Sequence, residues 1–303
     1  MRRLALATIA VAMVGCGLSV VGSDTSSSGG PADGGREASS NDVTNDPPDA
    51  PVDGSTCDGS PTCAPTDLVV LPQDQVVRAV AVTTDGLYFI NQTAKTIVRA
   101  GLDGSSPTDV LTTAEAARQL AVDGQLIWYT GPDLRRVATN GLSDVVIQTG
   151  VNGCVSVDPD KTSVYAADFD DNRILSFPYL DVVATDLLTA DAGVAFPWGV
   201  AATATDIYFT TSGTRPGIIY QRSKTGTTNT VIKEDQANPN CLTFDETGSL
   251  YWVNNADGTI HRSKADGSDE VVLVTNETNI TQVAVDEKFL YWGSQNKVKR
   301  LAR

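Results

Sequence analysis

The stretch that decides the fold is Leu250-Tyr251-Trp252-Val253-Asn254, which is followed by Ile260-His261-Arg262, Asp266-Gly267-Ser268 and Val271-Val272-Leu273. This order of aromatic pair, strand, turn and Val/Leu-rich strand recurs after residue 66. The copies are marked by Tyr88-Phe89, Trp128-Tyr129, Tyr165-Ala166, Tyr208-Phe209, Tyr251-Trp252 and Tyr291-Trp292, spaced 37 to 43 residues apart. Such a period with several short strands per copy is typical of a β-propeller, because one four-stranded unit cannot bury its apolar faces alone.

Each copy begins with small residues alternating with larger aliphatic ones, as in Ala79-Val80-Ala81-Val82. Small side chains at alternate positions suit an innermost strand beside a channel. The aromatic pair that follows is expected between blades. In four copies an aspartate ends the inner strand, and we expect it to cap the next turn through its side-chain oxygen. These aspartates are Asp123, Asp158, Asp245 and Asp286.

The sixth copy contains only three strands before Arg303, whereas Leu68-Val69-Val70-Leu71 precedes the first inner strand and belongs to no other copy. Pairing the two would remove an open sheet edge. The sequence therefore predicts an all-β fold over residues 67–303. This fold is a six-bladed β-propeller of four-stranded antiparallel blades, whose ring is closed by strand 68–71 completing the last blade.

At its aromatic and turn positions the chain resembles the six-bladed YWTD-type propellers of the low-density-lipoprotein receptor class. Residues 250–273 are the copy most similar to that pattern, and Leu290-Tyr291-Trp292 repeats its centre. No copy contains the full Tyr-Trp-Thr-Asp tetrad. The resemblance implies the propeller fold and the binding of partners on one face. The chain also looks like bacterial lipoproteins that contain such propellers.

Residues 1–16 have the order of a secretory signal, with Arg2 and Arg3 before an apolar core that ends at Gly15-Cys16. Met13-Val14-Gly15-Cys16 resembles the lipobox of bacterial lipoproteins, although that family prefers Leu at the position of Met13. The resemblance implies cleavage before Cys16 and lipidation of this residue. An ordinary signal peptide with an incidental cysteine is the alternative. Gly17 favours the outer membrane, since the family's inner-membrane retention signal is an aspartate at this position.

Residues 17–66 are rich in Ser, Gly, Asp and Pro and contain eight acidic residues and one basic residue. Such a segment cannot bury enough apolar surface to order itself, so we expect a disordered, extended tether. Cys57 and Cys63 enclose a turn-forming loop. In an exported protein we expect them to form a local disulfide.

The whole chain has a formal net charge of −15, and removing Arg2 and Arg3 with the signal leaves 20 − 37 = −17. Nucleic acid is excluded as an expected partner, because clustered Lys and Arg are absent from the sequence. The acidity is consistent with plain solubility outside the cytoplasm. We expect a monomeric propeller without a cofactor or a metal.

Ligands of propellers usually lie at the channel mouth, where the inner strands begin. Alignment of the copies places one set of residues at the mouth and a second set one step further in. The first set is Arg78, Arg118, Gly153, Pro197, Asn240 and Thr281; the second is Ala79, Gln119, Cys154, Trp198, Cys241 and Gln282. These positions vary between copies, so the scaffold does not dictate them. The binding candidates are Arg78, Arg118, Asn152, Trp198, Asn240 and Gln282.

Arg78 and Arg118 are predicted neighbours that either grip an anion with forked hydrogen bonds or neutralise Asp74 and Glu115. Trp198 either forms an aromatic wall at the mouth or plugs the channel.

Cys154 and Cys241 occupy equivalent positions two blades apart, which favours two small buried thiols. A bridge would require strand ends that approach within the span of a disulfide. The single histidine, His261, lies in a third strand, where a surface or interblade position is expected. No nucleophile motif accompanies it.

The leading functional hypothesis is a lipid-anchored, extracytoplasmic propeller that binds a protein, peptide or glycan without catalysis. The alternative is a lactonase or esterase that resembles the gluconolactonase and paraoxonase group and holds calcium in its channel. For that metal, Asn152, Asn238 and Asn240 offer amide oxygens, whereas the acids Glu115, Glu234 and Asp235 lie only in nearby loops.

Overall fold

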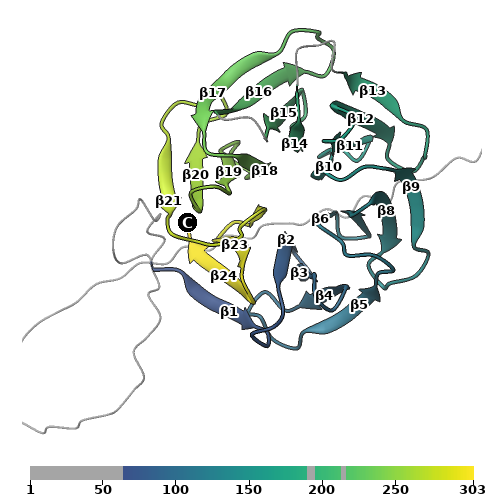
Figure 1. Cartoon of the computed structure of the whole chain (residues 1–303), viewed down its shortest axis with the longest axis vertical. Coiled ribbons are helices and arrows are strands. Elements are labelled where there is room, and N and C mark those ends of the chain that lie inside the picture. Colours follow the sequence, from purple (N-terminus) through teal and green to yellow (C-terminus); the bar gives the residue numbers. More distant parts are fainter. Residues whose placement is uncertain (1–63, 190–194, 213–215) are drawn as a thin grey trace, which may run out of the picture. The chain divides into compact units, whose positions relative to one another are not determined.

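The computed structural model describes residues 64–189, 195–212 and 216–303, in which 24 strands form six four-stranded antiparallel sheets around a channel (Figure 1). The predicted all-β, six-bladed propeller is confirmed. The predicted signal peptide, Cys16, the tether up to residue 63, and Cys57 with Cys63 lie outside the described residues. Among the described residues, no helix is long and apolar enough to cross a membrane.

In each blade the innermost strand borders the channel and the other three follow outward (Figure 1). Blade 1 contains β2 (Val77–Thr83), β3 (Gly86–Asn91), β4 (Thr96–Ala100) and β5 (Thr108–Thr112). Blade 2 contains β6 (Gln119–Val122), β7 (Leu126–Thr130), β8 (Asp133–Ala138) and β9 (Val145–Thr149). Blade 3 contains β10 (Val155–Val157), β11 (Ser163–Asp168), β12 (Arg173–Pro178) and β13 (Thr185–Leu188).

The second half of the ring repeats this order. Blade 4 contains β14 (Pro197–Ala202), β15 (Asp206–Thr211), β16 (Gly217–Ser223) and β17 (Thr230–Gln236). Blade 5 contains β18 (Pro239–Phe244), β19 (Leu250–Asn254), β20 (Thr259–Ser263) and β21 (Val271–Val274). Blade 6 contains β22 (Val283–Val285), β23 (Phe289–Ser294), β24 (Lys297–Ala302) and β1 (Thr66–Val70).

The ring closes as predicted, because β1 supplies the outer strand of blade 6. It pairs antiparallel with β24, with Val69 opposite Val298 and Val70 opposite Lys297. The strand covers residues 66–70 rather than the predicted 68–71. Leu71 still donates its backbone N–H to the carbonyl of Asn296. Ring closure therefore rests on both ends of the domain.

The core consists of apolar clusters between neighbouring blades, which explains why five of the six copies contain two aromatic residues in succession. Tyr88 packs in the cluster shared with blade 2, whereas Phe89 packs in the cluster shared with blade 6. Adjacent strand residues point to opposite faces of a sheet, so one pair serves both interfaces of its blade. Trp128, Trp252 and Trp292 are fully buried in the same way.

Three of the four repeated aspartates cap turns as predicted. Asp123 accepts the N–H groups of Gln125 and Leu126 through Oδ1, and Asp245 and Asp286 accept turn N–H groups in the same manner. Asp158 differs, because its Oδ1 pairs with Lys224 of blade 4 at 2.5 Å. These carboxylates thus fix hairpins, and Asp158 also joins two blades.

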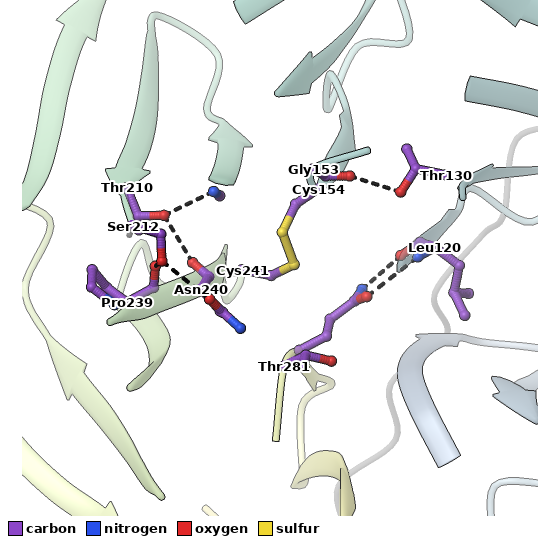
Figure 2. Close-up of a disulfide and its surroundings, with 12 residues drawn as sticks. Leu120, Thr130, Gly153, Cys154, Thr210, Ser212, Pro239, Asn240, Cys241 and Thr281 are labelled. Carbon is purple, nitrogen blue, oxygen red and sulfur yellow. Dashed lines mark hydrogen bonds between the residues drawn. A yellow bond between two sulfur atoms is a disulfide. The ribbon is translucent and has the colours of Figure 1, made fainter. Parts of the chain in front are cut away.

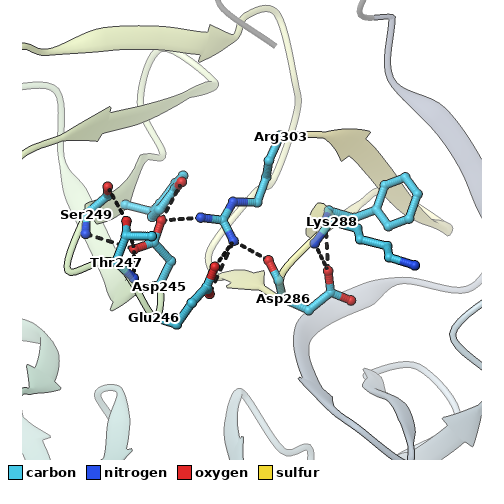
Figure 3. Close-up of polar contacts among 9 residues, drawn as sticks. Asp245, Glu246, Thr247, Ser249, Asp286, Lys288 and Arg303 are labelled. Atoms are coloured by element: carbon cyan, nitrogen blue, oxygen red, sulfur yellow. Dashed lines mark hydrogen bonds and ion pairs between the residues drawn. The ribbon is translucent and has the colours of Figure 1, made fainter. Parts of the chain in front are cut away.

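Arg303 links blades 5 and 6 on the face that carries these hairpins (Figure 3). Its guanidinium contacts the Asp245 carboxylate and the Asp286 carbonyl, and Nη1 lies 3.2 Å from Glu246 Oε1. Burial raises the pKa of Asp245, but hydrogen bonds from Thr247 and Ser249 and the Arg303 charge outweigh it and lower this pKa overall. Asp245 is therefore an ionised, buried anchor between blades.

Candidate functional site

The inner strands define two levels at the end of the channel where they begin. We call the residues that face the opening the mouth level and the residues one step deeper the floor level. Alignment on the residues paired with the second aromatic position gives both sets. The mouth level contains Arg78, Arg118, Gly153, Trp198, Asn240 and Thr281, and the floor level contains Ala79, Gln119, Cys154, Gly199, Cys241 and Gln282.

Blade 4 differs from the sequence alignment by one residue. Trp198 lies at the mouth level, not one step further in, and Gly199 takes its place at the floor level. These levels follow from Val200, which pairs with Phe209 as Val80 pairs with Phe89 in blade 1. A β-bulge precedes it between Pro197 and Val200, where three residue steps on β14 face two on β15. Equivalent bulges precede Val80 in blade 1 and Leu242 in blade 5. A bulge turns a side chain out of the regular pleat and is frequent at functional sites.

The channel floor is crossed by a disulfide between Cys154 and Cys241, whose Cα atoms lie 5.8 Å apart (Figure 2). The expectation of two buried thiols is therefore wrong. Blade 4 lies between these two blades and contributes Gly199 at this level, which has no side chain. Its backbone is also close to blade 5, since a Cβ on Gly199 would lie 2.4 Å from the Asn240 carbonyl oxygen. Glycine thus lets the strand ends approach within disulfide range.

Gln282 makes a second bridge across the floor, from blade 6 to blade 2. Its Nε2 donates to the Leu120 carbonyl at 2.6 Å, and its Oε1 accepts the Leu120 N–H at 3.3 Å. Figure 2 shows these two hydrogen bonds beside the disulfide. Beyond the floor the channel holds a cavity of about 190 Å³ lined by the inner strands. Gln282 is therefore a structural bridge rather than a freely available ligand contact.

Arg78 and Arg118 are neighbours at the mouth, as predicted. Within the described ranges neither arginine forms an ion pair, and Asp74 and Glu115 are exposed. The interpretation that they neutralise these two acids therefore has no ion pair among the described residues to support it. Burial, and then the charge of Arg118, lower the pKa of Arg78. Two adjacent guanidinium groups at the rim of an otherwise acidic protein attract an anion.

Three aromatic residues gather at the mouth in blades 3 and 4, whereas the two arginines lie in blades 1 and 2. Phe169, in the turn after β11, lies 5.3 Å from Phe196 and 5.4 Å from Trp198 between ring centroids. All three are half-buried. We call them the aromatic wall. Trp198 thus belongs to a wall at the mouth, and the disulfide and Gln282 rather than Trp198 close the channel.

Phe196 holds a backbone conformation that bulky residues rarely adopt, with φ of 56°. Two hydrogen bonds enforce it: its N–H donates to Asn172 Oδ1 at 2.7 Å, and its carbonyl accepts the Ser212 N–H at 2.9 Å. A strained backbone of this kind is maintained only where several surrounding contacts hold it in place, and such residues are common at binding sites.

Asn152 and Asn240 support the mouth through hydrogen bonds. Asn152 donates to Asp170 at 2.6 Å and accepts the Phe169 N–H at 3.2 Å, so it positions the aromatic wall. Asn240 is buried and accepts the Ser212 hydroxyl at 3.4 Å. Sequence reasoning missed Phe169, because it lies in a loop outside the repeated strands. Its only signal was an aromatic residue directly after a strand that ends in Asp168.

Gln119 is fully buried at the floor level, and neither of its amide atoms has a hydrogen-bond partner among the described residues. Arg78 and Trp198 are partly exposed, but their Nε and Nε1 atoms are buried and likewise have no hydrogen-bond partner among the described residues. Unpaired buried atoms also occur between blades, at Trp128 and Trp292, but three of the side chains concerned lie at this one channel end. Since most buried polar groups in folded proteins are paired, these three can be satisfied by a ligand or by ordered water.

The residues proposed for calcium do not fit a metal site. Asn238 and Asn240 both accept the Ser212 hydroxyl, at 2.6 and 3.4 Å, while the Asn152 oxygen accepts the backbone N–H of Phe169. Calcium prefers several convergent oxygens that include carboxylates. Across the described residues, no group of three or more His, Cys, Asp or Glu is placed to hold a metal ion.

His261 lies away from the mouth in a buried network between blades 4 and 5, as expected for an interblade residue. Its ring stacks on Trp252, Nδ1 lies 2.8 Å from Glu270 Oε1, and Nε2 lies 2.7 Å from the Thr259 hydroxyl. Glu270 also pairs with Lys233 of blade 4 at 2.7 Å. This arrangement joins two blades.

Comparison with solved structures identifies the fold. A chain of a nidogen/laminin complex is similar at a TM-score of 0.59 and 18% identity, over 67% of this chain and 81% of that one. Virginiamycin B lyase from Staphylococcus aureus is similar at 0.62 and 13%, over 80% and 99%. A gluconolactonase from Xanthomonas campestris is similar at 0.64 and 12%, over 79% and 89%. The sequence matches no model of a known protein family. At these identities the similarity establishes the β-propeller fold, which binding proteins and enzymes share.

Proposed function

We propose that this protein is an extracytoplasmic binding module that takes an acidic protein, peptide or glycan ligand at its channel mouth and performs no catalysis. The observation that carries the proposal is that Arg78 and Arg118, which form no ion pair among the described residues, share the channel mouth with the aromatic wall, in a chain with a net charge of −15. Arginine forks match carboxylates, and aromatic rings supply buried area to a binding interface.

Two further observations support binding over hydrolysis. The channel floor is crossed by the disulfide and by Gln282, so the inner strands do not frame an open metal pocket at that level. The amide oxygens considered for calcium are committed to Ser212 and Phe169. The fold similarity to a chain of a nidogen/laminin complex agrees with a role in protein binding.

An array experiment tests the proposal. The labelled protein is applied to arrays of acidic and neutral peptides and glycans, in parallel with the Arg78→Gln/Arg118→Gln double variant. We expect binding to acidic probes and at least a tenfold loss in the double variant. Arg262→Gln is the control, because it removes the same charge from β20, outside the mouth. Binding unaffected by the double variant, or calcium-dependent turnover of lactone or aryl-ester substrates, would refute the proposal.

We further propose that a lipid on Cys16 anchors the protein to the bacterial envelope, preferably to the outer membrane. The basic start, apolar core and terminal Gly15-Cys16 support this proposal. Metabolic labelling with a palmitate analogue tests it. Label should enter the unaltered protein but not Cys16→Ala, and the variant should leave the membrane fraction. Equal labelling of both proteins would contradict the proposal.

A further inference from the structure

The unpaired groups at the mouth describe the chemistry of the missing ligand. Arg78 Nε and Trp198 Nε1 are buried donors, and neither group can accept a hydrogen bond. They lie at the same level of blades 1 and 4, on opposite sides of a six-bladed ring. The charged donor of blade 1 calls for an anionic group, and the neutral donor of blade 4 calls for a second acceptor oxygen elsewhere on the same ligand.

Gln119 adds a requirement that a simple anion does not meet. Its amide contains an acceptor oxygen as well as a donor nitrogen, and both are unpaired among the described residues. It follows Arg118 in the chain and shares its register with Cys154 and Gln282, whose side chains cross the floor. A ligand that satisfies Gln119 must therefore bring a hydrogen-bond donor next to its negative charge.

We infer that the mouth recognises a carboxylate group with an N–H or O–H donor on the adjacent carbon framework, as found at the C-terminus of a peptide. The inference rests on the proposed function and names its ligand chemistry. Arg78 and Arg118 take the carboxylate, and Gln119 Oε1 accepts the neighbouring N–H. Capture of a C-terminal carboxylate by convergent donors is an established way of recognising peptides.

The aromatic wall indicates which type of side chain the C-terminal residue of the ligand has. Phe169 and Trp198 form an edge-to-face pair with an interplanar angle of 77°, and both remain partly exposed. Phe196 is held beside them in its unusual conformation. An apolar or aromatic side chain on the terminal residue packs against this wall while the carboxylate faces the arginines.

Entry of the ligand requires movement of side chains but not of the blades. Gln119 is fully covered in the free protein, whereas the preceding Arg118 is exposed. Arginine side chains have many rotamers and contact the ligand first. Their rearrangement then opens Gln119 to the ligand. The disulfide and the Gln282 bridge keep the floor beneath them fixed.

Calorimetry on the full chain with matched probes tests the inference. The probes are a hexapeptide ending in phenylalanine with a free carboxylate, the same peptide as its C-terminal amide, and free phenyllactate. We expect the amide to bind at least tenfold more weakly than the acid. Equal affinity for phenyllactate identifies a small acid as sufficient, whereas a tenfold preference for the peptide identifies a peptide terminus as the source. Both results support recognition of a carboxylate with a neighbouring N–H or O–H donor, which the two ligands have in common.

Variants separate a binding role from a packing role. Gln119→Leu should raise the melting temperature of the free protein, because it removes an unpaired buried amide, and should lower peptide affinity at least fivefold. Arg78→Gln and Arg118→Gln should each lower affinity at least tenfold, while Arg262→Gln leaves it unchanged. If Gln119→Leu does not fold, the affinities of the unaltered protein for the peptide acid and the peptide amide still test whether the mouth recognises a terminal carboxylate.

The outcomes that overturn the inference differ from those that overturn the proposed function. Equal binding of acid and amide, or an unchanged peptide affinity in Gln119→Leu, refutes the terminal-carboxylate chemistry. If acidic glycans bind on the array but no peptide with a free C-terminal carboxylate binds, the terminal-carboxylate chemistry is refuted, whereas the proposed function as a binding module is still supported. Absence of all mouth-dependent binding on the array refutes the proposed function itself.

Discussion

Removing the Cys154–Cys241 disulfide should destabilise the propeller substantially. The bond closes a loop of 87 residues. Loop-closure entropy for that length amounts to about 4.6 kcal/mol at 25 °C, since 2.1 plus 1.5R ln 87 is about 15.4 cal/mol/K. This value is an upper figure, because measured disulfide contributions are more often about 2–4 kcal/mol. A domain of this size loses about 2–4 °C in melting temperature per kcal/mol, so a decrease of roughly 4–18 °C is expected.

The Cys154→Ala/Cys241→Ala double variant is the cleanest perturbation, because it leaves no free thiol at the floor. Unfolding in guanidinium is followed by tryptophan fluorescence and circular dichroism, and non-reducing peptide mapping establishes the bond in the unaltered protein. Cys57→Ala/Cys63→Ala serves as the control, since it leaves the channel floor intact. A loss of less than about 1 kcal/mol in the floor variant, or free thiols at both positions, would refute this account of the floor.

Three further predictions concern the contacts between blades. Arg303→Ala should cost about 1–3 kcal/mol, because the Asp245 carboxylate is left buried without its cation, whereas Lys264→Ala at an exposed pair should cost less than about 0.5 kcal/mol; chemical denaturation checks both. Since the pKa of Asp245 is lowered in the folded state, its contribution is present above about pH 5 and is lost as the pH falls below about 4. In Asp245→Asn the free energy of unfolding should therefore fall less steeply between about pH 5 and pH 3 than in the unaltered protein. An unchanged dependence on pH would contradict this. Gly199→Ala should destabilise the protein by about 1–3 kcal/mol, because its Cβ would lie 2.4 Å from the Asn240 carbonyl oxygen. An unchanged melting temperature would contradict this, since it would mean that β14 and β18 move apart without loss of stability.

The sequence was sufficient for the fold because the propeller is built from one periodic unit. The aromatic pairs fall on both faces of each blade, so their spacing reports the blade period directly. The incomplete sixth copy and the extra strand at residues 68–71 predicted ring closure, and β1 and β24 confirm it. The turn-capping roles of Asp245 and Asp286 could also be predicted, because a side-chain oxygen that caps a turn acts on residues close to it in the sequence.

The site was predicted less completely, because it depends on departures from the period. Trp198 lies at the mouth level because Val200 pairs with Phe209, and the sequence could not place it because the spacing between such paired residues differs from copy to copy, as Val80–Phe89 and Leu242–Trp252 show. The Cys154–Cys241 bond depended on Gly199 and on how closely neighbouring strand ends approach, which is a property of tertiary packing. The lack of partners around Gln119 was equally invisible, since it is defined by what surrounds the residue in space.

The pairing of β1 with β24 also governs how the protein is made. Asp67 and Lys297 form an ion pair across this junction although they are 230 residues apart. Ribosomes add about 5–20 residues per second, so β1 waits roughly 12–46 s after its own synthesis for its partner strand to appear. During that interval the first strand has no sheet to join, and the growing blades expose edges that attract other chains. Folding of the nascent propeller is therefore completed at its last strand, and factors that shield β1 until then should raise the yield of closed rings.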